Sequence, residues 1–589
     1  LPDGQSQLTN VELGNIDRVE VLRGSTASLY GNGSAGVLSF SNDLRAPTPF
    51  AQSVRVLAGS YGQRKTQLRT VGRAGKAIGS LSVSRMTTDG FRQRSAAESR
   101  QLNAALDYSL GADSRIEVRA QVAEVPNAFN PGALTFGEYA IRRDSASAAN
   151  IRRGSDRRVK QDQFSISYHH GSEAQRAEYV ATTWISTRGV RNALSTAPPG
   201  PVSPTRGIYS TLERTFYGTR LSARYTLGET PRAPTIAGGF DLQQMRDLRI
   251  NQRSTAGRPT ARTDSIILNQ FETVGTIAPF VQAQWTPTSR ILLSAGGRYD
   301  RLTFAVRDYF TGDGGVNKGD NSGSRPLSAV SGHAGLTVTG WTLFAPYANI
   351  STSFETPTTT ELQVRPDRQG GFNPDLGPQR TLSTEIGARG TVSTLASWNV
   401  AAYRANVRNA IVQSRVLDGT AFFENAGRTR NAGIEAGGSI RLARVASVNA
   451  AYTWSNLTFA DYRQTNGTRV DTLDGKQLPG VPPQQLRVGL RSGSLRGFTL
   501  DADQTWTSAL FADDLNTIRV PGWGTGVTNV RASWSGMRNG YRFEPFVGVL
   551  NAQNNAYIGA VTVNGAFGRV LEPSPLRNWY VGMDIGVAR

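Results

Sequence analysis

Segments of about ten residues in which apolar and polar side chains alternate recur from residue 51 to the end of the chain. In residues 217–227 (YGTRLSARYTL), the odd positions are mostly apolar and the even positions are polar or glycine. Residues 116–122 (IEVRAQV) and 581–587 (VGMDIGV) repeat the pattern. Alternation of this kind has the period of a β-strand, and no helical segment interrupts the series. The sequence therefore predicts an all-β protein.

The connections between these segments are of two alternating kinds. Short turns such as 111–114 (GADS) follow one end of the segments, and long polar stretches such as 125–160, 189–213 and 355–380 follow the other. Short turns on one rim and long loops on the other are typical of a transmembrane β-barrel, which must pair its whole backbone inside the bilayer. About eleven long and about ten short connections give about 22 antiparallel strands, a size at which the lumen is plugged.

Composition narrows the classes of protein further. The 589 residues contain no Cys, which excludes disulfides and thiolate metal sites, and no apolar run as long as a transmembrane helix. The net charge of +20 favours an anionic ligand or anionic lipid, and no nucleic-acid-binding pattern accompanies it. No catalytic or metal-binding spacing stands out. We therefore expect neither an enzyme, nor a cofactor or metal site, nor a nucleic-acid partner.

Residues 18–41 (RVEVLRGSTASLYGNGSAGVLSFS) differ from the rest of the chain. Two short strand patterns flank a stretch rich in Gly and Ser, in which glycines permit turns that other residues resist. We interpret this segment as the remnant of a small domain around which the rest of the chain is wrapped.

Four stretches resemble motifs of the TonB-dependent outer-membrane receptors, a family that includes ferric-siderophore receptors. They are residues 18–40, SFETPTTTEL (353–362), FNPDLGPQRTLSTEIG (372–387) and ENAGRTRNAGIEAGGSI (424–440). The resemblance implies that residues 1–48 are the C-terminal part of a plug domain in the lumen and that residues 49–589 are a 22-stranded transmembrane barrel. The TonB box and the earlier part of the plug are not found in this sequence.

The resemblance also implies a function. Members of this family import a scarce ligand, most often a ferric siderophore, across the bacterial outer membrane, driven by TonB and its inner-membrane motor. We expect a monomer in contact with outer-membrane lipid and lipopolysaccharide. Importers of cobalamin, an oligosaccharide or haem are alternatives, although no histidine lies between residues 354–357 and 373–376, where haem receptors of the family carry one. A passive porin is a further alternative, but a porin needs no plug.

Two sets of candidate site residues follow. The resemblance places Arg23 at the plug arginine, and Glu385 and Glu435 at the two barrel glutamates, of an ionic lock between plug and barrel. Alternatively, both glutamates are solvated carboxylates of the lumen. Cationic and aromatic side chains of the outer loops suit an anionic ferric chelate, the alternative for each being contact with lipopolysaccharide. These candidates are Arg142, Arg143, Arg152, Arg153, Tyr209, Arg246, Arg249, Phe372 and Tyr462.

Overall fold

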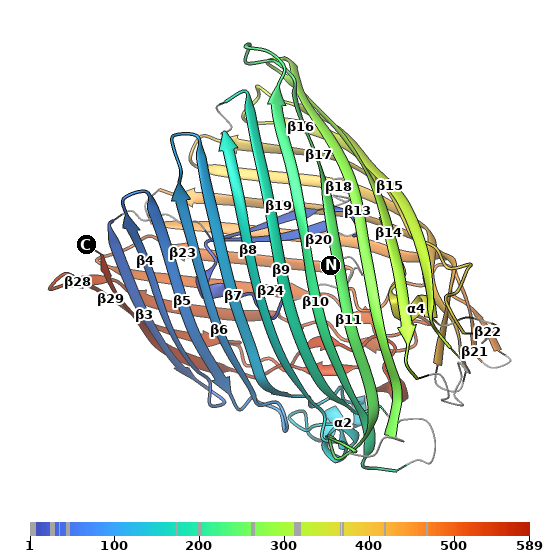
Figure 1. Cartoon of the computed structure of the whole chain (residues 1–589). Helices are drawn as coiled ribbons and strands as arrows, with labels where there is room; N and C mark the ends of the chain where they lie inside the picture. The colour runs from blue at the N-terminus through green and yellow to red at the C-terminus, as the bar shows by residue number, and fades with distance from the viewer. Residues whose placement is uncertain are drawn as a thin grey trace.

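The computed structural model of the chain is a closed antiparallel β-barrel (Figure 1). It describes residues 8–23, 30–33, 36–42, 48–171, 175–196, 203–260, 265–310, 320–363, 365, 367, 370–417, 420–443, 445–466 and 469–588. Twenty-two strands form the wall, which confirms the predicted fold class. The ring closes where the first wall strand pairs with the last, from Ala51 opposite Ala588 to Gly59 opposite Tyr580.

The wall strands follow one another around the ring in chain order, each antiparallel to the next. They are β3 (Phe50–Gly59), β4 (Arg64–Ala74), β5 (Ala77–Thr88), β6 (Ala97–Ser109), β7 (Ser114–Phe129), β8 (Asp156–Gly171), β9 (Ala177–Leu194), β10 (Arg206–Thr226), β11 (Thr235–Thr255), β13 (Ile266–Thr288), β14 (Ile291–Asp308), β15 (Gly323–Val338), β16 (Ala345–Glu355), β17 (Gln379–Val392), β18 (Ala396–Leu417), β19 (Thr420–Leu442), β20 (Ala446–Asp461), β23 (Gln484–Ser492), β24 (Phe498–Thr507), β27 (Val527–Trp534), β29 (Tyr541–Leu550) and β32 (Asn578–Ala588).

Short elements lie in the lumen and in the connections. The strands are β1 (Arg18–Arg23), β2 (Gly36–Ser41), β12 (Arg258–Pro259), β21 (Arg463–Asn466), β22 (Arg469–Thr472), β25 (Leu510–Phe511), β26 (Arg519–Val520), β28 (Gly536–Arg538), β30 (Ile558–Val561) and β31 (Leu571–Pro573). The helical turns are η1 (Leu13–Asn15), α2 (Phe136–Ile141), α3 (Ala148–Arg152), α4 (Thr359–Gln363) and η3 (Ala566–Gly568). Within the described ranges, no helix has the length and apolar character needed to cross a membrane.

The wall strands have two different faces. On β13, Ile277 and Val281 are 58% and 53% exposed on the outward face, whereas Ala278 and Phe280 are buried on the other. On β10, Tyr217 and Tyr225 bracket the apolar outward face, separated by about 26 Å of strand. Aromatic residues at both edges of an apolar band are typical of barrels in a bilayer.

Some outer loops, such as 189–213, are shorter than the sequence predicted, whereas others, such as 355–380, have nearly the predicted bounds. The stretch 189–213 belongs to β9 as far as Leu194 and to β10 from Arg206 onward. Strands can continue past the apolar band, where the outward face meets water and no longer needs apolar side chains. The polar continuation of a strand then has the composition of a loop, which is why the sequence of residues 189–213 predicted a loop along its whole length.

The N-terminal segment lies inside the ring. β1 and β2 pair with each other, from Arg18 opposite Ser41 to Arg23 opposite Gly36, and form a sheet separate from the barrel. Figure 1 shows this blue segment surrounded by the wall strands. The structure thus places the described part of residues 8–42 in the lumen.

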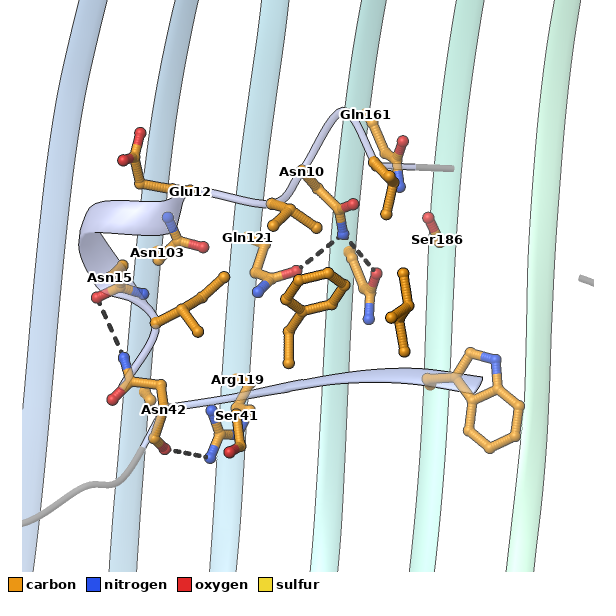
Figure 2. A pocket seen from close by; sticks show the side chains of 18 of the residues that line it. Asn10, Glu12, Asn15, Ser41, Asn42, Asn103, Arg119, Gln121, Gln161 and Ser186 are labelled. Atoms are coloured by element: carbon orange, nitrogen blue, oxygen red, sulfur yellow. Dashed lines mark hydrogen bonds between the residues drawn. The ribbon is translucent and has the colours of Figure 1, made fainter. Parts of the chain in front are cut away.

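Polar contacts join this segment to the wall. Asn10 Nδ2 donates to Gln121 Oε1 on β7 at 3.1 Å and to Gln163 Oε1 on β8 at 3.2 Å (Figure 2). Farther along, Arg119 Nη2 donates to the Asn42 carbonyl at 3.2 Å. These contacts span the segment from its first turn to the end of β2.

Glu12 makes the most concentrated of these contacts. Its carboxylate accepts hydrogen bonds from Lys65 Nζ at 2.6 Å, Ser84 Oγ at 2.8 Å and the Gly14 amide at 2.9 Å. Burial by itself raises the pKa of Glu12, but the bonds from Lys65, Gly14 and Ser84 together outweigh it and hold the pKa below the ordinary 4.5. The carboxylate is therefore a charged anchor at neutral pH.

Substitution of Val281 by Arg tests the orientation of the wall. An arginine on the outward face between Ile277 and Trp285 should destabilise the folded barrel by about 2–4 kcal/mol, because it meets hydrocarbon. Denaturant unfolding in lipid bilayers measures this difference. Gln282→Arg on the lumen face is the matched control and should cost far less. Equal costs would contradict the assignment of faces.

The docking of the N-terminal segment should depend on pH. Because the pKa of Glu12 is lowered in the folded state, its contribution is fully present above pH 4.5 and is lost as the pH falls through the folded-state value. Amide exchange of residues 8–17, corrected for the intrinsic pH dependence of exchange, should therefore accelerate in acid. Glu12→Gln should exchange fast at every pH, whereas the control Glu20→Gln should behave as wild type. A Glu12→Gln variant with unchanged protection refutes the anchor.

Candidate functional site

A row of polar side chains crosses the lumen wall toward its outer end. Adjacent members lie opposite each other in the ladders between β8, β9, β10, β11 and β13. We call them the lumen row; they are Gln161, Arg188, Arg214, Asp247 and Glu272. All five are buried.

Most charges of the lumen row are neutralised within the wall. Arg214 donates from Nε and Nη2 to the two carboxylate oxygens of Asp247, at 2.8 and 2.6 Å. Glu272 pairs with Arg249 of β11, with 3.1 Å between Oε1 and Nε. The forked pair of Arg214 with Asp247 is strong because both groups are charged and the geometry is planar. Arg188 differs, since its hydrogen-bond partner is the neutral amide of Gln161, with 3.3 Å between Nη1 and Oε1.

A second buried ion cluster supports the tip of the N-terminal segment. Arg298 Nε donates to both carboxylate oxygens of Asp300 at 3.0 Å, and Nη1 donates to Asp241. Gly31 approaches this cluster closely at a φ of +83°, and a Cβ there would lie 3.1 Å from Arg298 Nη2. The neighbouring Tyr30 ring centroid is 5.9 Å from the Arg220 guanidinium. The Tyr-Gly step thus fits against the wall because it lacks a side chain at Gly31.

Asn32 connects this tip to an outer loop. Its Nδ2 donates to Thr356 Oγ1 at 2.8 Å, and the Thr356 amide donates to Asn32 Oδ1 at 3.1 Å. Thr356 begins the connection 356–378 between β16 and β17. In this connection Leu362 of α4 is fully buried in a cluster with Phe354. The contacts between Asn32 and Thr356 therefore attach the N-terminal segment to the β16–β17 connection.

The outer loops pack on one another at the end of the barrel that carries α2 (Figure 1). The backbone at Leu134 pairs with that at Leu571, and both side chains are buried. Glu138 of α2 accepts from Arg569 Nη1 and Nη2, each at 2.7 Å. Burial raises the pKa of Glu138, but hydrogen bonds from Arg569 and Thr135 overcome this effect and lower it. The loops β7–β8 and β29–β32 thus form one packed unit.

Two predicted ligand residues remain accessible. Arg142 and Arg152 are exposed in the β7–β8 loop, and Arg142 Nε donates to Asp144 at 2.9 Å. Two other predicted ligand residues hydrogen-bond to the backbone of neighbouring loops instead. Arg143 Nη2 donates to the Ser574 carbonyl at 2.6 Å, and Arg153 donates to the Ser195 carbonyl. The carbonyl contacts already engage one nitrogen of each of these two guanidinium groups.

Three predicted loop residues lie in wall strands instead. Tyr209 is half-buried near the outer end of β10, opposite Gln252. Arg249 faces the lumen, where it forms an ion pair with Glu272 and donates a hydrogen bond to Thr360 Oγ1. Arg246 lies between the buried Met245 and Asp247 and so points outward, 5.5 Å from the Tyr217 ring centroid. This orientation removes Arg246 from the candidates for a lumen ligand.

Phe372 and Tyr462 are structural. They are 9% and 3% exposed, and each packs in a hydrophobic cluster of the outer loops. The Tyr462 hydroxyl donates to the Gln413 carbonyl at 3.0 Å. Loop packing covers both rings in this structure, and the expectation that they present aromatic surface to a ligand stays a prediction.

The ionic lock stays a prediction. The side chain of Arg23 lies outside the part of the chain that the structure describes. Glu385 shares a strand face with the buried Thr381 and Ser383 and accepts from the Tyr347 hydroxyl at 2.9 Å, so it faces the lumen. Glu435 follows the outward-facing Ile434 and faces the lumen as well.

The lumen row is not among the site residues that the sequence predicted. Its members sit at alternate positions of strands, for example Arg188 between the outward-facing residues at 187 and 189. A charged residue on the lumen side of an alternating segment is the signal that could have identified them. Which of them are neutralised depends on strand register, which the sequence does not give.

In the described part of the chain, no group of three His, Cys, Asp or Glu side chains could hold a metal ion.

Comparisons with known proteins place the chain in a family. Residues 102–554 match the family described as TonB dependent receptor-like, beta-barrel, and residues 1–38 match the TonB-dependent receptor plug domain. The ferrioxamine receptor of Yersinia enterocolitica is 24% identical over 271 residues, which are 46% of this chain and 34% of that receptor. The ferrioxamine B receptor of Salmonella typhimurium is 25% identical over 247 residues, 41% of this chain and 31% of the receptor. These matches span about a third of the curated relatives' length.

Solved structures share the fold. An unliganded ferric citrate transporter superposes with a TM-score of 0.82 at 16% identity, over 98% of this chain and 84% of the transporter. The ferric yersiniabactin uptake receptor of Yersinia pestis gives a TM-score of 0.78 at 15% identity, over 97% of this chain and 85% of the receptor. At such identities the likeness concerns architecture alone. The family match, which covers most of the barrel, shows that the chain belongs to the TonB-dependent receptors.

Proposed function

We propose that the protein is an outer-membrane receptor that imports a ferric siderophore or a similar iron chelate, driven by TonB acting on the plug. One observation carries the proposal: an N-terminal segment is held inside a closed 22-stranded barrel. In this proposal residues 1–48 are the C-terminal part of the plug and residues 49–589 are the barrel. A segment in the lumen obstructs passive diffusion and gives an external motor something to displace.

The nature of the plug contacts supports an energised mechanism. Hydrogen bonds of Asn10 and Asn32 and two ion pairs, Glu12 with Lys65 and Asp17 with Arg69, hold the segment. Val19 and Val21 of β1 are about half exposed rather than packed on the wall. Polar contacts can be exchanged for contacts with water, so their net strength is modest and mechanical work can break them one by one.

The names of the related proteins favour an iron chelate as the imported ligand. The relatives and solved structures reported above are receptors for ferrioxamine, ferric citrate and ferric yersiniabactin. Import of cobalamin, an oligosaccharide or haem is the alternative, and a passive porin is disfavoured by the lumen segment. We propose transport and not catalysis, by a monomer in the bacterial outer membrane. Arg246, exposed beside Tyr217 on the outward face, suits contact with anionic lipopolysaccharide.

Growth of a receptor-deleted strain on defined iron sources tests the proposal. Expression of the receptor should restore growth on at least one ferric chelate, and deletion of TonB should abolish the rescue, because displacement of the plug needs its work. The control is growth on freely soluble iron, which neither deletion should affect. Rescue without TonB would reject energised import, and unchanged use of every chelate would reject an iron ligand.

The ionic lock gives a second prediction. In the predicted lock Arg23 faces Glu385 and Glu435, so Arg23→Glu should loosen the plug by repulsion between carboxylates, and the double variant Arg23→Glu/Glu435→Arg should restore it. Limited proteolysis of residues 8–42 in the purified receptor measures retention of the plug. Arg18→Glu, at an exposed position of the same strand, is the control. Absence of rescue by the exchanged pair would argue that the two glutamates are simply solvated.

A further inference from the structure

Four exposed arginines gather on the outward face of the barrel, at the outer ends of β17, β18 and β19. Their direction follows from the alternation of the strands. On β18, Val400 is exposed on the outward face and Ala401 is buried on the lumen side, so Arg404 points outward. We call the four the outward arginine cluster; they are Arg380, Arg404, Arg408 and Arg430.

The register of the ladders brings these side chains close together. Arg380 lies directly opposite Arg408. Arg430 lies opposite Asn406, which has Arg404 and Arg408 as its neighbours on the same face of β18. Opposite residues on one face of a sheet are about 5 Å apart at Cβ, and diagonal neighbours are about 7–8 Å apart. Long guanidinium side chains at these separations can contact the same anion.

The charge of the cluster is not neutralised by the protein. Within the described residues none of the four forms an ion pair, whereas the adjacent Arg428 pairs with Asp461 at 2.8 Å. On β5 and β6, the outward-facing Arg85 and Arg100 share the carboxylate of Glu98, at 2.9 and 2.8 Å. Like charges opposite each other weaken a sheet. The cluster faces away from the lumen, so no part of a plug inside the barrel reaches it, and an anion that neutralises it comes from the surroundings.

The cluster lies at the depth of lipid headgroups. Arg380 is two residues beyond the exposed, outward-facing Leu382, and Arg404 is two residues beyond Ala402. A strand rises about 3.4 Å per residue, so each arginine begins about 7 Å beyond the last apolar residue. The headgroup layer extends about 5–8 Å on each side of the hydrocarbon core. This depth favours a lipid over a soluble protein as the partner.

We propose that the outward arginine cluster binds the phosphate groups of an anionic glycolipid of the outer leaflet, the lipid anchor of lipopolysaccharide. A guanidinium group donates two parallel hydrogen bonds to a phosphate, and several such groups suit a headgroup with more than one negative charge. The acyl chains of the lipid contact outward apolar residues of the same strands, such as Ile386 and Ile434. This inference goes beyond import and rests only on the proposed location in the outer membrane.

Native mass spectrometry of the purified receptor with bisphosphorylated lipid A tests the site. Wild type should bind this lipid at least about tenfold more tightly than the dephosphorylated lipid with the same acyl chains, because the arginines attract the phosphates. Arg404→Gln/Arg430→Gln should lose the preference, and Arg404→Lys/Arg430→Lys should keep part of it. The matched control Arg85→Gln/Arg100→Gln removes two outward arginines that share Glu98 and should keep all of it. Equal binding of both lipids by wild type, or an unchanged preference in Arg404→Gln/Arg430→Gln, overturns the inference.

Thermal unfolding in detergent separates lipid binding from folding. Without lipid, Arg404→Gln/Arg430→Gln should melt at or above the temperature of wild type, because it removes repulsion between like charges. Bisphosphorylated lipid A should raise the melting temperature of wild type more than that of the variant, since a ligand stabilises the protein that binds it more tightly. An equal rise overturns the inference. A variant that melts below wild type without lipid would show that the arginines are held within the protein, which also overturns it.

Uptake of ferric chelates by the receptor-deleted strain separates this inference from the proposed function. If cells import no chelate in a TonB-dependent way but the purified receptor prefers the phosphorylated lipid, the import function fails and the lipid site stands. If import operates and Arg404→Gln/Arg430→Gln binds lipid A as wild type does, the lipid site alone fails. Loss of uptake by that variant would then assign the arginines to the imported ligand.

Discussion

The structure depends on one constraint, the need to pair every backbone amide and carbonyl that lies within hydrocarbon. A sheet meets this constraint only if it closes, and here closure is made by the seam between β3 and β32. The seam joins residues separated by almost the whole chain, so no subset of strands can complete the wall. The alternation of side chains, the short inner turns and the outward tyrosines at both edges of the apolar face of β10 all follow from fitting such a ring into a bilayer.

Closure creates a second problem, because a ring of this size encloses a lumen too wide for its own side chains to fill. The lumen wall is polar, and most of its charges are neutralised between adjacent strands, as in the pair of Arg214 with Asp247 and the cluster around Arg298. In the lumen row, Arg188 instead hydrogen-bonds to the neutral amide of Gln161.

Different interactions hold the outer loops and the N-terminal segment in place. The loops bury apolar side chains such as Leu134, Leu362 and Tyr462, so opening them would expose apolar surface to water. The N-terminal segment is held by polar contacts such as those of Glu12, Asn10, Asp17 and Asn32, which water can replace. A pulling force therefore meets less resistance from the segment than from the loops, which suits a plug that yields while the barrel persists.

The strand period, the number of strands and the separate character of residues 18–41 could be predicted from the sequence, because alternation and turn composition are local properties. The sequence did not determine where strands end above the bilayer, since water-exposed strands and loops have the same composition. It also could not tell that Arg246 faces outward, that Phe372 and Tyr462 are buried, or that Arg188 lies opposite Arg214. These facts depend on strand register and loop packing, which only contacts between distant parts of the chain decide.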